Sequence, residues 1–267
     1  MTSMTSTAST TGWVDEYLTR IGLTRPVSAD LQALRDLQLA HLLTVPFENL
    51  SIHLGEPIVL DQDSLVAKVA RMRRGGFCYE LNGAFAALLT ALGFRVSLLS
   101  ARVFGDGGQP GPPFDHLTLR VDLAEPWLVD VGFGRFSMQP LRLSIPGDQT
   151  DPGGTFRVAD SPSGNGELDI SHDGEPAYRV DPRPYTLSDF GPTCWWQQTC
   201  PGSHFRKSLT CSLSTSSGRV TLSRDRLIIT QHGHREERTL TSDAEILDAY
   251  RRYFGIDLDR VPIIAAD

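Results

Sequence analysis

The chain has 267 residues, 40% of them hydrophobic, and a formal net charge of −7. This length suits one large domain or two to three smaller subdomains with a sizeable core. The acidic balance argues against a nucleic-acid-binding protein, and no apolar run reaches the ~18 residues that a membrane span needs. We therefore expect neither a nucleic-acid partner nor a membrane partner.

The N-terminal segment 1–12 is rich in serine and threonine, without a basic residue or an apolar core. It predicts a disordered tail rather than a secretory signal. The four cysteines form no Cys-x-x-Cys pair, and the histidines add no zinc spacing, so we expect no metal. This cysteine usage fits a reducing, cytoplasmic setting.

Residues 13–93 carry mainly helical patterns. Apolar side chains recur at helical spacing over 14–21 and again over 31–42. Pro46 stops the second helix, because the residue before a proline is disfavoured in helical conformation. Ser64 is a candidate N-cap for a third helix.

The next predicted helix begins at or near a cysteine. Gly75 and Gly76 lead into Cys78, and the apolar run 83–92 predicts a buried helix closed by Gly93. Unpaired N–H groups at a helix start favour negative charge, so we expect the Cys78 thiol to lose its proton readily and to act as a nucleophile. The two glycines can take backbone angles closed to other residues, which would let a second molecule come close to the sulfur.

The pattern then changes to strands. Residues 94–104 are rich in valine and leucine, and a short turn joins two further predicted strands, 116–123 and 127–131. His116 opens the first of this pair on its polar face, and Asp130 lies on the second, so the two side chains can meet across the pair. A nucleophile, a base and an orienting carboxylate form a catalytic triad. The alternative for Cys78 is a small buried hydrophobic residue.

More short strands with turn signals predict a small barrel or curved sheet up to about Tyr185, and the segment 188–200 then bridges two subdomains. A capping box at Ser242 predicts the start of the last helix. Helices and strands are segregated rather than alternating, which predicts an α+β fold. The later predicted strands are 209–213, 220–222 and 227–230.

Together these motifs resemble the arylamine N-acetyltransferase family over most of the chain. The matching segments are 45–50 (VPFENL), 74–82 (RGGFCYELN), 115–117 (DHL), 129–134 (VDVGFG) and 203–205 (SHF). The resemblance implies a cysteine-protease-like core and three parts. These are a helical domain over 13–93, a β-barrel domain over 94–187, and an interdomain segment with an α/β lid over 188–267.

The resemblance also implies acetyl-coenzyme A as co-substrate and a ping-pong reaction. The acetyl group would pass through Cys78 to the nitrogen of a small arylamine, arylhydrazine or related amine, releasing coenzyme A, with no metal. The implied catalytic residues are Cys78, His116 and Asp130. Residues expected to contact coenzyme A are His204, Phe205, Gly132 and Phe133, and those expected to contact the amine are Phe133 and Phe47.

Three alternatives share this scaffold or its chemistry. An amide synthase would accept an acyl chain from a carrier protein and close a macrolactam. A transglutaminase-like or proteolytic cysteine enzyme would act on a glutamine or peptide. A catalytically silent binding module would not need all three of Cys78, His116 and Asp130, so their presence argues against it.

Several other side chains are expected to have structural roles. Arg74 is predicted to form an ion pair with Glu48. Trp195 and Trp196 are expected in the core. The remaining histidines are expected in solvent or in turns, namely His41, His53, His172, His232 and His234.

Overall fold

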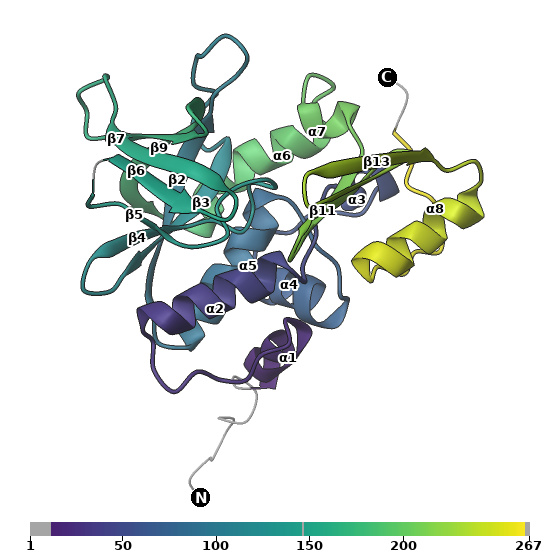
Figure 1. Ribbon diagram of the computed structural model, residues 1–267, viewed down its shortest axis with the longest axis horizontal. Helices are drawn as coiled ribbons and strands as arrows, with labels where there is room; N and C mark the ends of the chain where they lie inside the picture. Colours follow the sequence, from purple (N-terminus) through teal and green to yellow (C-terminus); the bar gives the residue numbers. More distant parts are fainter. Residues whose placement is uncertain (1–11, 146, 265–267) are drawn as a thin grey trace, which may run out of the picture.

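The computed structural model describes residues 12–145 and 147–264. N-terminal helices pack against a nearly closed antiparallel barrel, and a second sheet with its own helices lies beside them (Figure 1). This arrangement confirms the predicted α+β fold. Of the predicted tail over 1–12, only Gly12 lies among the described residues, and it begins the first helix.

The helical part supplies the first core. Its members are α1 (Gly12–Arg20), α2 (Leu31–Leu42), α3 (Leu50–Leu54), α4 (Gln62–Val66), the π-helical turn η1 (Ala67–Arg71) and α5 (Cys78–Ala91). Helix α5 is buried over most of its length and lies inside the largest hydrophobic cluster, as the apolar run 83–92 predicted. The predicted cap at Ser64 is wrong, because the Asp61 carboxylate caps α4 by accepting the Ser64 N–H at 2.8 Å.

Eight antiparallel strands form the barrel. In sheet order they are β5 (Leu141–Arg142), β4 (Pro126–Val129), β3 (His116–Asp122), β2 (Arg95–Val103), β9 (Glu175–Tyr185), β8 (Leu168–His172), β7 (Gly154–Asp160) and β6 (Gly147–Asp151). The two edge strands approach each other, since the Gln149 side chain bonds both backbone groups of Arg142, at 2.7 and 2.9 Å. This contact brings the sheet close to closure. Helix α5 packs against β2 and β3. The first turn of this helix therefore lies near His116, the first residue of β3.

The second sheet has five strands and a separate core. Their order is β1 (Phe47–Glu48), β10 (Thr210–Thr215), β11 (Gly218–Ser223), β12 (Arg226–Gln231) and β13 (His234–Thr239). Helix α8 (Asp243–Ala249) and the π-helical turn η3 (Tyr250–Phe254) cover it and share its hydrophobic cluster. Strand β1 belongs to the helical part of the chain, so pairing of Phe47 with Ser212 anchors this sheet near the start of α5.

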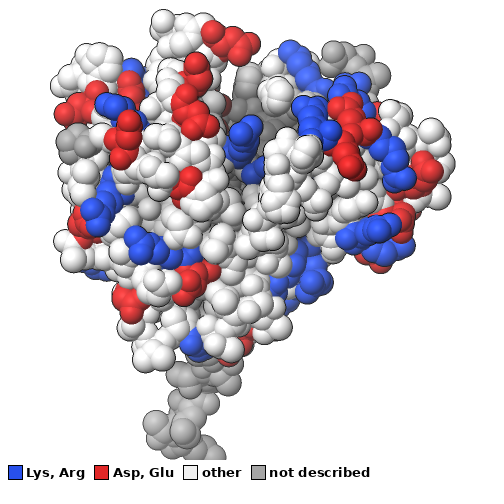
Figure 2. Space-filling view, in the orientation of Figure 1, with Lys and Arg blue, Asp and Glu red and all other residues white. Residues whose placement is uncertain are grey.

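A short helical segment connects the barrel to the second sheet. It contains η2 (Leu187–Phe190), α6 (Gly191–Thr199) and α7 (His204–Lys207). Trp195 and Trp196 on α6 are 65% and 41% exposed, so their predicted place in the core is wrong. Figure 2 shows the surface hollowed between the barrel and the second sheet, with Lys and Arg side chains beside the hollow. No helix in the described ranges is long and apolar enough to cross a membrane.

Candidate active site

The three side chains predicted as catalytic lie together in the structure. Cys78 is the first residue of α5, His116 is the first residue of β3, and Asp130 directly follows β4. His116 Nε2 lies 2.6 Å from Asp130 Oδ2, and the Cys78 thiol lies close enough to the His116 ring for each group to shift the pKa of the other. Because Nε2 faces Asp130, Nδ1 is the ring nitrogen left for the sulfur. All three residues are buried.

The start of α5 is fixed by a carboxylate and by close packing. Glu80 accepts the N–H of Phe77 at 3.2 Å and forms an ion pair with Lys68. A Cβ on Gly75 would lie 1.9 Å from the Pro46 carbonyl oxygen, and one on Gly76 would lie 2.6 Å from the Glu80 side chain. Neither glycine has a positive φ. The pair therefore does not use the left-handed angles that glycine can take, and close packing explains the two glycines instead.

Electrostatic contacts favour a proton on His116. Burial by itself lowers the pKa of His116, but the Asp130 carboxylate and the hydrogen bonds to Asp130 and Cys78 raise it to about 10. Burial would raise the pKa of Asp130, yet the charge and hydrogen bond of His116 hold it below its usual value. The negative charge of a Cys78 thiolate adds to this rise, so the raised pKa describes the imidazolium paired with a thiolate, the state reached once the thiol proton has moved to His116.

The pKa of Cys78 shifts opposite to the prediction. Burial raises the pKa of this thiol, against the lowering effects of the His116 hydrogen bond and charge and of the Leu117 N–H. Burial outweighs these contacts because a thiolate loses hydration in an apolar site. Activation of the sulfur therefore depends on transfer of its proton to His116.

Asp130 is held by three further donors. Asn82 donates to Asp130 Oδ1 at 2.9 Å, and the Gly132 N–H donates to the same oxygen at 2.9 Å. The Tyr178 hydroxyl donates to Oδ2 at 3.0 Å. Asn82 lies in a recognised motif, four residues after Cys78 on the same helical face, but its role was not predicted. Tyr178, on β9, was missed because no local sequence signal marks it.

The loop after Asp130 lies directly against the nucleophile. A Cβ on Gly132 would lie 2.7 Å from Cys78 Cα, so only glycine fits there. The Phe133 ring packs edge-on to the His116 ring, with centroids 5.1 Å apart. Gly134 has φ 88°, and a side chain there would meet the Phe47 ring. The structure thus places Gly132 and Phe133 beside Cys78 and His116.

Two predicted aromatic residues, Phe47 of the second sheet and Phe205 of α7, lie near the start of α5. The Phe205 ring packs edge-on to Phe77, with centroids 5.1 Å apart, and lies 6.3 Å from the Phe47 ring. Asn49 donates to the Phe205 carbonyl at 3.0 Å and fixes α7. His204 is exposed beside Phe205. Its contacts include none of the three catalytic candidates.

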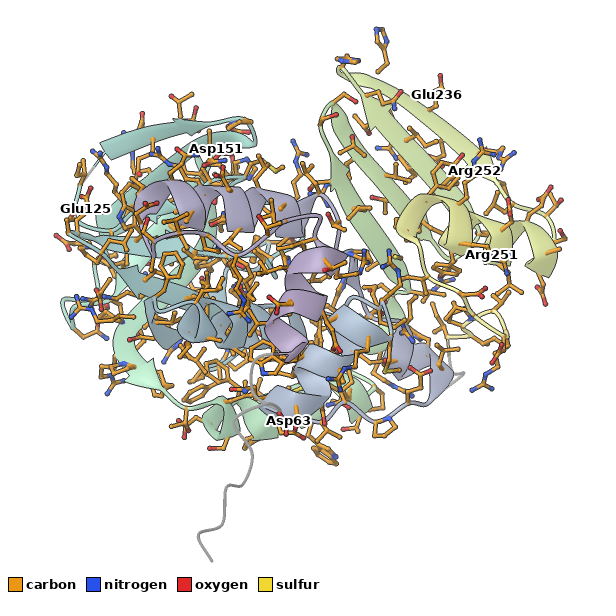
Figure 3. The ribbon with its side chains drawn as sticks, turned by 90° about the horizontal axis from the view of Figure 1, so that it is seen from below. Asp63, Glu125, Asp151, Glu236, Arg251 and Arg252 are labelled. Atoms are coloured by element: carbon orange, nitrogen blue, oxygen red, sulfur yellow. The ribbon has the colours of Figure 1, made fainter. Side chains whose placement is uncertain are left out.

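A cavity of about 690 Å³ lies between the barrel and the second sheet. Phe136 and Arg135 line its barrel side, and Ser214 and Arg219 line its sheet side. Arg219 also donates to the Gly134 carbonyl at 2.7 Å, which joins this cavity to the loop beside Cys78. In Figure 3, Asp151 lies on the barrel and Glu236 on the second sheet, on the two sides of this separation. None of the cavity's lining residues was predicted.

Two structural predictions have different outcomes. Arg74 and Glu48 form a buried ion pair at 3.0 Å, as expected. His41 and His53 are buried, so their predicted exposure is wrong. Burial, with the charge of Arg20, lowers the pKa of His41 to about 3.

Among the residues that the structure describes, no group of three or more His, Cys, Asp or Glu side chains is placed to hold a metal ion.

Comparisons with known proteins agree with this architecture. A model of the N-acetyltransferase family matches residues 30–263. An arylamine N-acetyltransferase of Mycolicibacterium smegmatis is 36% identical over 252 residues, which are 91% of this chain and 91% of that protein. The solved arylamine N-acetyltransferase from Salmonella typhimurium matches with a TM-score of 0.86 and 32% identity, covering 94% of this chain and 93% of its own. The Mycobacterium marinum enzyme solved in complex with CoA gives 0.82 and 30%, covering 91% and 92%.

Proposed function

The chain belongs to the arylamine N-acetyltransferase family, and on that basis we propose that it acetylates arylamines, arylhydrazines or related amines. The acetyl donor is acetyl-coenzyme A, and Cys78 carries the acetyl group between the two half-reactions. The observation that supports this most strongly is the buried contact chain from Cys78 through His116 to Asp130. A free thiol at Cys78 requires a reducing setting, and we propose the cytoplasm.

In the first half-reaction, His116 Nδ1 takes the proton of the Cys78 thiol as the sulfur attacks the acetyl carbonyl carbon. Asp130 stabilises the imidazolium that forms, which is the role its 2.6 Å contact and the raised pKa of His116 support. The C–S bond to coenzyme A then breaks. Its thiolate leaves with the proton that His116 held, and acetyl-Cys78 remains.

The tetrahedral intermediate of this step carries a negative oxygen. The N–H of Cys78 lies in the first turn of α5, where helical backbone donors have no intrahelical partner. We assign this N–H to the oxyanion, an interaction typically contributing about 3–4 kcal/mol of transition-state stabilisation. The helix dipole acts in the same direction.

In the second half-reaction, the amine nitrogen attacks the carbonyl carbon of acetyl-Cys78. His116 takes a proton from the nitrogen, and the Cys78 thiolate leaves and is reprotonated. We propose that Phe133 and Phe47 contact the aromatic ring of the amine. Phe133 supports this because its partly exposed ring lies against His116, 5.1 Å between centroids.

Coenzyme A is a polyanion with a long pantetheine arm. We propose that Gly132, Phe133, His204 and Phe205 contact it, as the family resemblance implied. The cavity beside the Gly134 carbonyl, lined by two arginines, adds a place for its phosphates. A likeness to a relative solved with CoA supports this co-substrate.

Release of free thiol tests the proposal. The protein is mixed with acetyl-coenzyme A and an aniline or a hydrazine, and coenzyme A thiol is followed with a colorimetric reagent. We expect thiol release that requires both substrates and is lost in Cys78→Ser. An amide synthase would need an acyl-loaded carrier protein, and a transglutaminase-like enzyme would turn over a glutamine peptide without coenzyme A. Turnover only under either of those conditions would refute the proposed function.

A further inference from the structure

The turn that leads into His116 has an unfavourable backbone. Phe114 has φ 63°, in the left-handed region that bulky residues rarely adopt. The Tyr79 hydroxyl donates to the Phe114 carbonyl at 2.9 Å and to the Asp115 carbonyl at 3.1 Å. A conformation of this kind persists only where its surroundings hold it. The place of His116 therefore depends on what fixes this turn.

The Asp115 side chain connects the turn to the α6–α7 segment. Gln197 on α6 donates through Nε2 to Asp115 Oδ1 at 2.8 Å, and its Oε1 accepts the Ser203 hydroxyl at 2.7 Å. The Ser203 oxygen caps α7 by accepting the Phe205 N–H at 3.1 Å. Gln197 and Ser203 are both buried. Three hydrogen bonds in series thus run from the residue before His116 to Phe205.

The far end of this series returns to the nucleophile. Phe205 packs edge-on to Phe77, which is the residue before Cys78. At the centre of the series, Gln197 must donate to a carboxylate and accept from a hydroxyl. A neutral amide does both, whereas an ionised carboxylate only accepts and an aliphatic side chain does neither.

We propose that Gln197 is a positioning residue that fixes His116, through Asp115, relative to the helix that carries Phe205. This inference rests on the proposed function in assigning His116 as the base and Cys78 as the nucleophile. It adds a residue outside the triad whose hydrogen bonds keep the base and the Phe205 side of the site in register. Disturbing its bond to Asp115 should weaken the action of His116 on the Cys78 thiol.

The decisive variant is Gln197→Glu, which keeps the shape and the Ser203 bond but sets two carboxylates against each other. The rescue variant combines Gln197→Glu with Asp115→Asn. The amide now at position 115 then donates to the carboxylate now at position 197, so the hydrogen bond returns with donor and acceptor exchanged. The matched control is Gln198→Glu, on the next residue of α6, whose side chain contacts Cys194 and Ile58 instead.

The readout is the rate of Cys78 alkylation by iodoacetamide, with site-specific mass spectrometry and thermal unfolding of each variant. We expect Gln197→Glu to slow alkylation about three- to thirtyfold at neutral pH, the range of couplings through such networks. Relative to wild type, the rate should recover as pH falls, because two facing carboxyls can share a proton. The rescue variant should regain most of the rate, and amide exchange over 114–117, the turn that the Asp115 bond fixes, should rise only in Gln197→Glu.

Three results would each overturn the proposal. They are a wild-type rate in Gln197→Glu, an equal loss in Gln198→Glu, and no recovery in a folded rescue variant. Alkylation uses the free enzyme without donor or acceptor. A protein that fails to acetylate amines would therefore refute the proposed function without deciding this test.

Discussion

Asn82 lies four residues after Cys78 on α5, and its side-chain amide donates to Asp130 Oδ1 at 2.9 Å. The same amide group donates to the Leu117 carbonyl at 2.7 Å, and its oxygen accepts the Val131 N–H at 3.0 Å. One side chain on the nucleophile's helix therefore links β3, which carries His116, to the segment directly after β4 that carries Asp130. The relative placement of all three residues depends on it.

Replacing Asn82 by leucine should destabilise the fold and the site together. The change leaves the Leu117 carbonyl, the Val131 N–H and one Asp130 oxygen short of a partner in a buried region. We expect the free energy of unfolding to fall by about 2–5 kcal/mol, since each buried unpaired group costs about 1–3 kcal/mol. Urea denaturation measures this. A change within about 0.5 kcal/mol, as for surface substitutions, would show that these bonds contribute little.

Asp130→Asn should reduce the rate far more than the stability. An amide of the same shape can donate to His116 and select the wrong tautomer, and it no longer stabilises the imidazolium. We expect acetyl transfer to fall on the order of a hundredfold or more. This is less than the roughly 10⁴-fold loss that the equivalent change causes in a serine protease, because a thiol is intrinsically more acidic than a hydroxyl. The rate and the thermal unfolding are measured on one sample. A destabilised variant with a normal rate per folded molecule would assign Asp130 to barrel stability alone.

The raised pKa of His116 predicts how stability depends on pH. Its folded value is about 10, above the ordinary 6.5. The stabilisation from its proton is therefore complete below about pH 6.5 and is lost as pH rises toward about 10. In a Cys78→Ser background, which removes the thiol titration and the Cys78 contribution to this pKa, the unfolding free energy is compared with and without His116→Gln. The larger contribution of Asp130 remains, so the window still begins near pH 6.5 and ends below about 10.

The difference in unfolding free energy between the proteins with and without His116 should shrink by up to about 1.4 kcal/mol per pH unit as pH rises through this window. Denaturant titrations at several pH values between about 6 and 10 measure it. A difference that stays constant would show that the Asp130 carboxylate does not hold a proton on His116.

Gly75→Ala should destabilise the start of α5 through overpacking. The added Cβ would fall 1.9 Å from the Pro46 carbonyl oxygen, which is backbone and cannot turn aside. We expect a loss of about 1–3 kcal/mol in unfolding free energy. Gly105→Ala is the matched control, because open space surrounds that position and its φ is not positive. Equal stability of the two variants would contradict the packing argument.

The sequence predicted the class of fold and the three central side chains for physical reasons that are local. The glycine pair and apolar run marked the start of α5, and a short turn placed Asp130 beside His116. The capping box at Ser242 is present, with its hydroxyl accepting the Glu245 N–H at 3.3 Å. The division into parts at residues 93 and 187 stays a prediction, as do the contacts to coenzyme A.

The missed features depend on contacts between distant segments. Tyr178 reaches Asp130 from a strand that pairs with β2, so only the barrel topology brings them together. Strand β13 is exposed along its whole length and carries almost no apolar pattern. His41 is enclosed between the rings of Tyr17 and Phe85. The raised pKa of Cys78 likewise follows from burial, which helix position alone does not reveal.

Mass spectrometry of the acetylated protein tests the central claim most directly. The protein is mixed with acetyl-coenzyme A without an acceptor, quenched in acid, and digested for peptide mapping. We expect one acetyl group on Cys78 and none in Cys78→Ser. After removal of the remaining acetyl-coenzyme A, addition of an arylamine before the quench should remove the acetyl group from Cys78 and yield the acetylated amine in equal amount. An unmodified Cys78, or an acetyl group that persists in the presence of the amine while product forms, would contradict transfer through this cysteine.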